Sequence, residues 1–322
     1  MEKTYNLFRK FLPIIIGCAL VGFAFSLLTL IYYYNDSTIS INFLNVMPIL
    51  TILIFLGTIA LVIYFSLKIK SLGLAKIKKS FGFSKFAASL TAALAAALFF
   101  FDFFRFVQTP TTSSPLRIAR ILIFIPFIAY FVVNMLPSRI KRKKLVLPRW
   151  LRPLTSTCAL IWAIIGLLMV YFWGGLPAGN VFRLIHTFYY ILLIVFFMFE
   201  AKFEFFAPMP RAYIMSSLLL FVYSFVLTGS ITLTKVLGGV ESVSISDFEL
   251  FLSFSIGIYA LSRMICVMQT LKFVMSKSSG SHRRHRHHHH HTASSSVQAA
   301  KATPSSDAGE SNSSENNNTE NK

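Results

Sequence analysis

The sequence contains few acidic residues, with 12 Asp and Glu against 31 Lys and Arg in 322 residues. It also contains three cysteines, and His186 is the sole histidine before residue 282. One imidazole excludes the helical zinc-protease motif, which needs two, and the cysteines have no metal-ligand spacing. Phosphate-binding loops and Gly-x-Gly-x-x-Gly stretches are absent too. These absences predict a protein that is not an enzyme and holds neither a cofactor nor a metal.

Apolar residues are abundant instead: they make up 55% of the chain, and 34 residues are Phe. Soluble domains contain roughly 45–50%. A helix needs about 20 apolar residues to cross a bilayer, and eight runs approach or exceed that length. The sequence therefore predicts an all-α, polytopic membrane protein with eight transmembrane helices, near residues 11–33, 46–67, 86–106, 118–136, 154–173, 184–199, 212–228 and 248–271.

The segments between these runs alternate between many and few basic residues. Segments 1–10, 68–85 and 139–152 are crowded with Lys and Arg, whereas segment 34–45 has none and segments 107–117, 174–183 and 229–247 have one each. The positive-inside rule then predicts that both termini are cytoplasmic, in a cell membrane. Because this topology accounts for the net charge of +19, we expect anionic lipid head groups as partners of the basic loops and no binding of nucleic acid.

Residues 1–276 form the predicted eight-helix domain, and residues 277–322 form a tail rich in His, Ser and Asn. The tail lacks aromatic residues, so we expect it to be disordered and cytoplasmic. It includes five consecutive histidines, His287 to His291. The favoured interpretation is a native low-complexity tract, and an expression tag, metal binding and pH sensing remain as alternatives.

Two local patterns predict structure within this frame. Ala88, Ala92 and Ala96 recur every four residues in the third run, which favours close packing of another helix and a central place for that span. Residues 230–236 and 240–245 alternate polar and apolar side chains around Leu237-Gly238-Gly239, which predicts a short outer hairpin. Residues 246–249 resemble a capping box that opens the eighth span.

Ionisable residues within spans are the first place to look for function. Six polar residues from three helices share one depth near the outer ends of their spans, and four of them are Arg. Forked guanidinium donors suit a phosphate, a carboxylate or a lipid head group, so these residues form a candidate outer anion site. The alternative is that the arginines extend to lipid phosphates and have a structural role. The candidate residues are Asp102, Arg105, Arg117, Arg120, Arg183 and His186.

A second candidate lies at the inner side of the bundle. Arg263, about two turns inside the eighth span, has no acidic neighbour along its helix, and Glu200 and Glu204 end the sixth span. A cross-bundle ion pair between Arg263 and either glutamate is predicted. It would be a structural clamp or, alternatively, a gate, and a third possibility is that Arg263 extends to inner head groups.

These patterns favour a non-enzymatic accessory, scaffold or interaction protein. The alternative is a transporter or flippase-like, lipid-handling protein that uses the outer anion site. A continuous polar cavity joining Arg105, Arg120, Arg183 and His186 would favour transport, whereas a solid core with these side chains turned outward would favour the accessory role.

Overall fold

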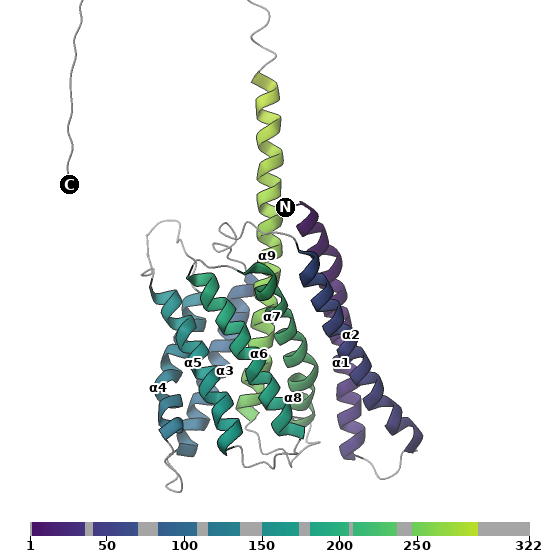
Figure 1. Cartoon of the computed structure of the whole chain (residues 1–322), viewed down its shortest axis with the longest axis vertical. Helices are drawn as coiled ribbons and strands as arrows, with labels where there is room; N and C mark the ends of the chain where they lie inside the picture. Colours follow the sequence, from purple (N-terminus) through teal and green to yellow (C-terminus); the bar gives the residue numbers. More distant parts are fainter. Residues whose placement is uncertain are drawn as a thin grey trace, which may run out of the picture. The chain divides into compact units, whose positions relative to one another are not determined.

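The computed structural model describes residues 2–35, 41–69, 83–107, 115–135, 150–173, 181–205, 209–236 and 247–288. Within these ranges every regular element is a helix (Figure 1). The elements are α1 (Glu2–Asn35), α2 (Ile41–Lys68), α3 (Phe83–Val107), α4 (Pro115–Met135), α5 (Leu151–Trp173), α6 (Val181–Glu204), α7 (Pro210–Tyr223), the π-helix η2 (Ser224–Thr228), α8 (Gly229–Val236) and α9 (Asp247–His288).

Eight helical stretches are long and apolar enough to cross a membrane, which confirms the prediction of a helical, multi-pass membrane protein. The seventh stretch, expected to be short, is among the longest because α7, η2 and α8 continue one another. The stretches are Glu2–Ile31, Pro48–Lys68, Lys85–Phe104, Ile118–Met135, Leu151–Phe172, Arg183–Lys202, Pro210–Val236 and Phe248–Lys272.

The chain divides into two compact units, Met1–Ser276 and Lys277–Lys322. The first contains all eight candidate spans. In the second, α9 continues to His288, so the first part of the predicted tail is helical. An existing helix extends by one hydrogen bond per added residue without a new nucleation step. Residues 289–322, where most of the predicted tail lies, are outside the described residues.

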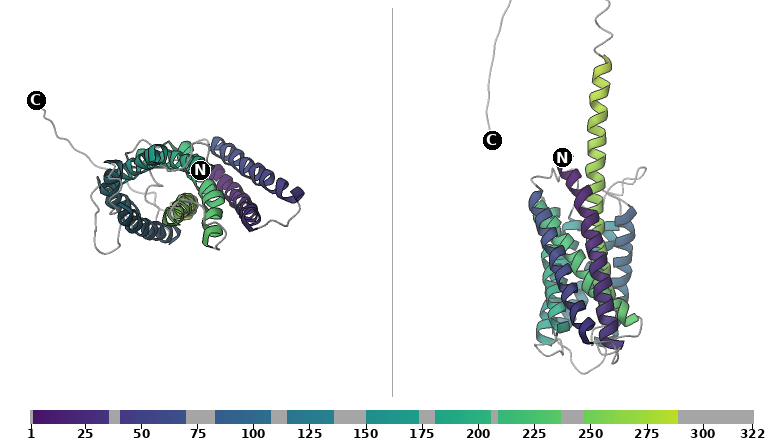
Figure 2. Two further views of the ribbon diagram at one scale, coloured as in Figure 1. Left: turned by 90° about the horizontal axis from the view of Figure 1, so that it is seen from below. Right: turned by 90° about the vertical axis from the view of Figure 1, so that its right-hand side faces the viewer.

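Within the first unit, α9 occupies the middle of the bundle. Its side chains contact α4 through Tyr130 and Tyr259, α6 through Glu200 and Arg263, and η2 through Phe225 and Phe254. Helices α3 to α6 contact one another in chain order, and α7 contacts α6 and α2. Figure 2 (left) shows α9 inside the arc of these helices. The helices therefore enclose the polar residues of α9.

Helix α3 is not the central span that its alanine pattern predicts. In the most apolar 18-residue stretch of α3, 44% of the residues are buried. The corresponding shares are 78% for the α7–η2–α8 span and 72% for α9. The alanine face itself is buried: Ala88, Ala92 and Ala96 belong to the core. Small side chains thus mark a face where helices pack closely, but they do not determine which helix lies at the centre.

The predicted outer hairpin is wrong in its first half, because Gly229–Val236 is the helix α8. Its hydroxyl residues bond back to the helix: Ser230, Thr232 and Thr234 each donate to the carbonyl four residues earlier, at 2.7, 2.6 and 2.8 Å. Self-bonded hydroxyls are compatible with an apolar span, so their alternation with apolar residues does not indicate a strand. Residues 240–245, the second half, lie outside the described residues.

The α7–η2–α8 span and α9 approach each other closely at Gly257. A Cβ atom added there would lie 2.4 Å from the Cβ of Ser224, the first residue of η2. Gly57 provides a control, since an added Cβ would meet nothing within 4 Å. The absence of a side chain at Gly257 therefore allows the two most buried spans to touch.

We predict that Gly257→Ala lowers stability by about 1–3 kcal/mol, because overpacking displaces the η2 backbone. Gly57→Ala, which adds the same methyl group in open space, is expected to be neutral or slightly stabilising, since Ala favours helices more than Gly does. Thermal unfolding of both purified variants in detergent measures the difference. Equal melting temperatures would contradict the proposed role of this contact.

Candidate functional site

The bundle has two ends with different charge. We call the end at which α1 begins the basic end; among described side chains it carries Lys10, Lys68, Lys85, Arg152 and Lys272. The other is the opposite end, where α4, α6 and α9 begin. Among the described residues, a buried ion pair joins α9 to a neighbouring helix at each end.

At the opposite end, Arg120 of α4 forms an ion pair with Glu249, in the first turn of α9. The Nη2 atom of Arg120 lies 3.3 Å from Oε1 of Glu249, and the two side chains are 4% and 18% exposed. Nη2 also donates to the hydroxyl of Tyr190 at 2.5 Å, and that hydroxyl donates to Oε1 of Glu249. Arg120, Tyr190 and Glu249 therefore form a closed triangle of charge-assisted hydrogen bonds.

Aromatic rings surround the Arg120 guanidinium. Its central carbon lies 4.9 Å from the ring centre of Trp162 and 5.3–5.7 Å from the ring centres of Phe99, Phe103 and Tyr190. Cation–π attraction is strongest when the cation is desolvated, as this one is. The rings come from α3, α5 and α6, so with α4 and α9 five helices meet at one charge. We call these residues, with Glu249, the Arg120 cluster.

The hydrogen bonding of the Arg120 cluster is incomplete. Among the described residues, Arg120 Nε, Trp162 Nε1 and Nε2 of the neighbouring His186 have no hydrogen-bond partner. The charge is nevertheless balanced, because one guanidinium faces one carboxylate. Because four rings also enclose this paired guanidinium, the cluster is a contact between helices.

Of the six predicted outer residues, the structure brings Arg120 and His186 together beside Tyr190. Both side chains are buried, whereas Arg183 donates to the backbone carbonyl of Tyr171 at 2.7 Å. Asp102 is half-buried in α3. The side chains of Arg105 and Arg117 lie outside the described residues.

The sequence prediction missed Glu249 as the partner of Arg120. Its position, three residues after Ser246, indicated a capping box, in which the carboxylate would return to the backbone of Ser246. Oε1 of Glu249 accepts from Arg120 and Tyr190. Ser246 lies outside the described residues, so the capping box stays a prediction. The pairing could have been predicted from the scarcity of acidic residues. Among the span residues, few carboxylates other than Glu249 could neutralise a buried arginine.

At the basic end, Arg263 of α9 pairs with Glu200 of α6. Nη2 of Arg263 donates to Oε1 of Glu200, and Nε donates to the hydroxyl of Tyr213, in α7, at 3.1 Å. The structure thus brings together two of the three predicted inner residues, while the side chain of Glu204 lies outside the described residues. We call Arg263, Glu200 and Tyr213 the Arg263 cluster.

Lys85 is a further buried basic residue, although its sequence position predicts only a loop charge in segment 68–85. It lies in the first turn of α3, is 5% exposed, and is in electrostatic range of Arg263, Glu200 and Arg152. Lys85 ends a long basic segment. The pattern of basic residues in the sequence does not distinguish a buried lysine from solvated ones beside it.

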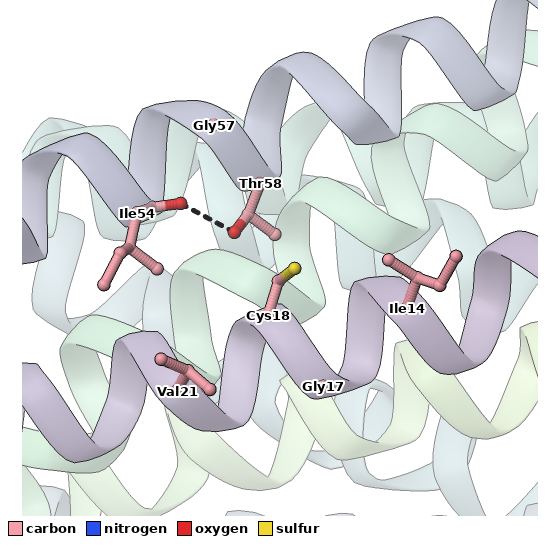
Figure 3. Close-up of a pocket in the computed structure, with 7 residues that line it drawn as sticks. All are labelled: Ile14, Gly17, Cys18, Val21, Ile54, Gly57 and Thr58. Atoms are coloured by element: carbon pink, nitrogen blue, oxygen red, sulfur yellow. Dashed lines mark hydrogen bonds between the residues drawn. The ribbon is translucent and has the colours of Figure 1, made fainter.

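Two clefts in the described part of the chain have mostly apolar linings, and no residue of either cluster lines them. One, with a volume of about 480 Å³, lies between α1 and α2 and is lined by Gly17, Cys18 and Gly57, among others (Figure 3). Its hydroxyl, on Thr58, donates to the carbonyl of Ile54 at 2.7 Å. A smaller cleft, of about 180 Å³, adjoins α3, α8 and α9. Among the described residues, no group of three or more His, Cys, Asp or Glu could hold a metal ion.

We predict that Arg120→Gln destabilises the protein by about 3–5 kcal/mol, because it leaves Glu249 without its counter-ion in a largely buried place. Glu249→Gln should also destabilise, and the double variant should be more stable than the sum of the two single effects implies. Arg183→Gln, at a more exposed arginine of the opposite end, should lower stability less than either single variant does. Thermal unfolding of the four variants provides the cycle, and additive effects would show that the pair is not coupled.

No protein family, curated protein or solved structure matches this chain.

Proposed function

We propose that this multi-pass protein is a non-enzymatic accessory, scaffold or interaction protein of a plasma-type membrane. In this proposal the basic end and both termini face the cytoplasm, as the alternation of basic and sparse segments predicts. The basic end binds anionic head groups or a partner protein, because its cations face the leaflet that carries negative charge.

The observation that carries this proposal is the closed state of the Arg120 cluster. A transport site for anions needs cations that a substrate can reach, but the charge of Arg120 is balanced by Glu249 and surrounded by four rings. Arg183, a second candidate, donates to a backbone carbonyl. Packing of this kind favours a rigid core over a substrate path. A protein with such a core would interact with partners at its surface.

Transport remains the alternative, and one observation favours it. Two buried ion pairs, Arg120 with Glu249 and Arg263 with Glu200, join α9 to its neighbours near the two ends of its span. Glu249 and Arg263 are about 21 Å apart along the helix at 1.5 Å per residue. If α9 moved, one pair could open while the other stayed closed, which is how alternating gates work.

The orientation can be tested by cysteine labelling. In a variant whose three native cysteines are replaced by Ala, a cysteine placed at Ser40 should react with an impermeant maleimide on intact cells. A cysteine at Ser138 should react only after the membrane is opened. The reverse pattern would place the basic end outside and remove the basis for its cytoplasmic partners.

Transport of lipid can be tested in reconstituted vesicles. We expect vesicles containing the purified protein to expose a fluorescent phospholipid to external dithionite no more than protein-free vesicles do, because Arg120 and Arg263 are paired with glutamates inside the bundle. Faster loss of the inner-leaflet signal would contradict the accessory role. A further change in that rate on Glu249→Gln would then support the gate interpretation.

A further inference from the structure

The cleft between α3, α8 and α9 opens on the outer surface of the bundle at the opposite end. It has a volume of about 180 Å³ and is lined by Leu98 of α3, by the end of α8 and by the start of α9. Leu98, Val236 and Phe251, one side chain from each of these helices, are 47%, 77% and 40% exposed, whereas Leu250 is buried at the base of the cleft. The cleft is therefore accessible from the lipid that surrounds the helices.

The ends of three spans determine the depth of this cleft in the membrane. Val236 is the last residue of its apolar stretch and Phe248 is the first of the next, so both lie where the hydrocarbon layer meets the head groups. Leu98 lies six residues, or about 9 Å, before the end of its stretch at Phe104. The cleft thus extends from the head-group boundary into the layer of acyl chains.

The volume of the cleft distinguishes between a lipid chain and a helix as its occupant. Spread over a depth of about 9 Å, a volume of about 180 Å³ corresponds to a mean cross-section of about 20 Å², which is about 5 Å across. A hydrocarbon chain fills that width, because carbon atoms in contact are about 3.5–4.0 Å apart. A helix, which is about 10 Å in diameter with its side chains, does not fit.

Lys235 is the basic residue of the lining, and it lies at the head-group end of the cleft. It is in the last turn of α8, where the helix dipole favours a cation. The hydroxyl of Thr232, the other polar side chain of the lining, donates within its own helix to the carbonyl of Thr228 at 2.6 Å. An ammonium group has three N–H donors, so a phosphate oxygen can bind it beside another acceptor. The cleft is therefore complementary to a molecule with an anionic head and an apolar chain.

We infer that this cleft binds one acyl chain of an anionic phospholipid, whose phosphate pairs with Lys235. The phospholipid comes from the leaflet at the opposite end, because the cleft begins at the depth of the head groups and opens sideways to the acyl chains. The site goes beyond the proposed function, in which anionic lipid binds at the basic end. The cleft between α1 and α2 has no charged residue in its lining, so it provides no such preference for an anion.

A carboxylate of this chain is the competing partner for Lys235. Asp247 precedes Phe248 and Glu241 lies in the segment between α8 and α9, and both side chains are outside the described residues. If either carboxylate neutralised Lys235 completely, the cleft would accept zwitterionic and anionic lipids equally. The two explanations therefore differ in the lipid preference measured at the cleft itself.

The test determines which lipid lies at the cleft in the full-length protein, reconstituted in vesicles of equal parts phosphatidylglycerol and phosphatidylcholine. Phe251→Trp places a fluorophore in the lining, in a background that carries Trp150→Phe and Trp173→Phe and keeps Trp162, which is 1% exposed. Brominated chains on one lipid or the other quench the tryptophan beside them. We expect a preference of about fivefold for phosphatidylglycerol, which corresponds to the free energy that one basic residue contributes near an anionic surface.

Lys235→Gln should abolish this preference, and Lys235→Arg, which keeps the charge, should retain it. Val21→Trp, in the cleft between α1 and α2, is the control and should be quenched equally by both lipids. The inference is overturned by equal quenching at Phe251→Trp, by an undiminished preference in Lys235→Gln, or by no quenching from either lipid, since a protein segment would then fill the cleft. The comparison of Phe251→Trp with Val21→Trp decides the matter even where Lys235→Gln does not fold. A reversed topology would overturn the proposed function and leave this site intact.

Discussion

The buried guanidinium of Arg120 is the contact on which the arrangement of the bundle depends most. It joins α4 to α9 through Glu249 and to α6 through Tyr190, and it is covered by rings from α3 and α5. In a low-dielectric interior, exposing Arg120 or Glu249 to lipid, or leaving either without the other, is unfavourable by several kcal/mol of free energy, on the order of the penalty for an unpaired buried charge. The five helices are therefore held in one register by a contact that apolar packing alone would not specify.

The relation between the two ends of α9 follows from that constraint. Near its start α9 provides the acid of an ion pair, and near the end of its span it provides the base. Glu249 in the first turn is also favoured by the dipole of α9. Each pair fixes the depth of the central helix against a different neighbour, α4 at one end and α6 at the other. Sliding of α9 along its axis would break both pairs.

Much of the fold could be predicted from the sequence, because span length and basic-residue asymmetry depend on composition over many residues. The pairing of Glu200 with Arg263 could also be proposed, since acids are so rare in this chain that few partners exist. The same argument would have found Glu249 for Arg120, but a local motif offered a simpler explanation. A local motif thus drew attention away from a long-range partner of the same side chain.

Other features could not be read from the sequence. The alternation of hydroxyl and apolar residues in 230–236 has the period of a strand, yet the hydroxyls are satisfied within a helix. Whether a lysine such as Lys85 is solvated or buried depends on which helices pack beside it. The central position of α9 depends on the contacts of all its neighbours, which no single segment encodes.

The attachment of α1 and α2 has a consequence for biosynthesis. Their contacts with the rest of the bundle include α7, η2 and α8, together with a buried hydrogen bond of 2.8 Å between the hydroxyls of Ser26 and Ser230. A chain is made from its N-terminus, so these two helices enter the bilayer long before that partner span exists. During that interval lipid alone surrounds their outer faces, and their docking is among the last steps of assembly. The first hairpin must therefore be stable in the membrane by itself, which is consistent with its strongly apolar composition.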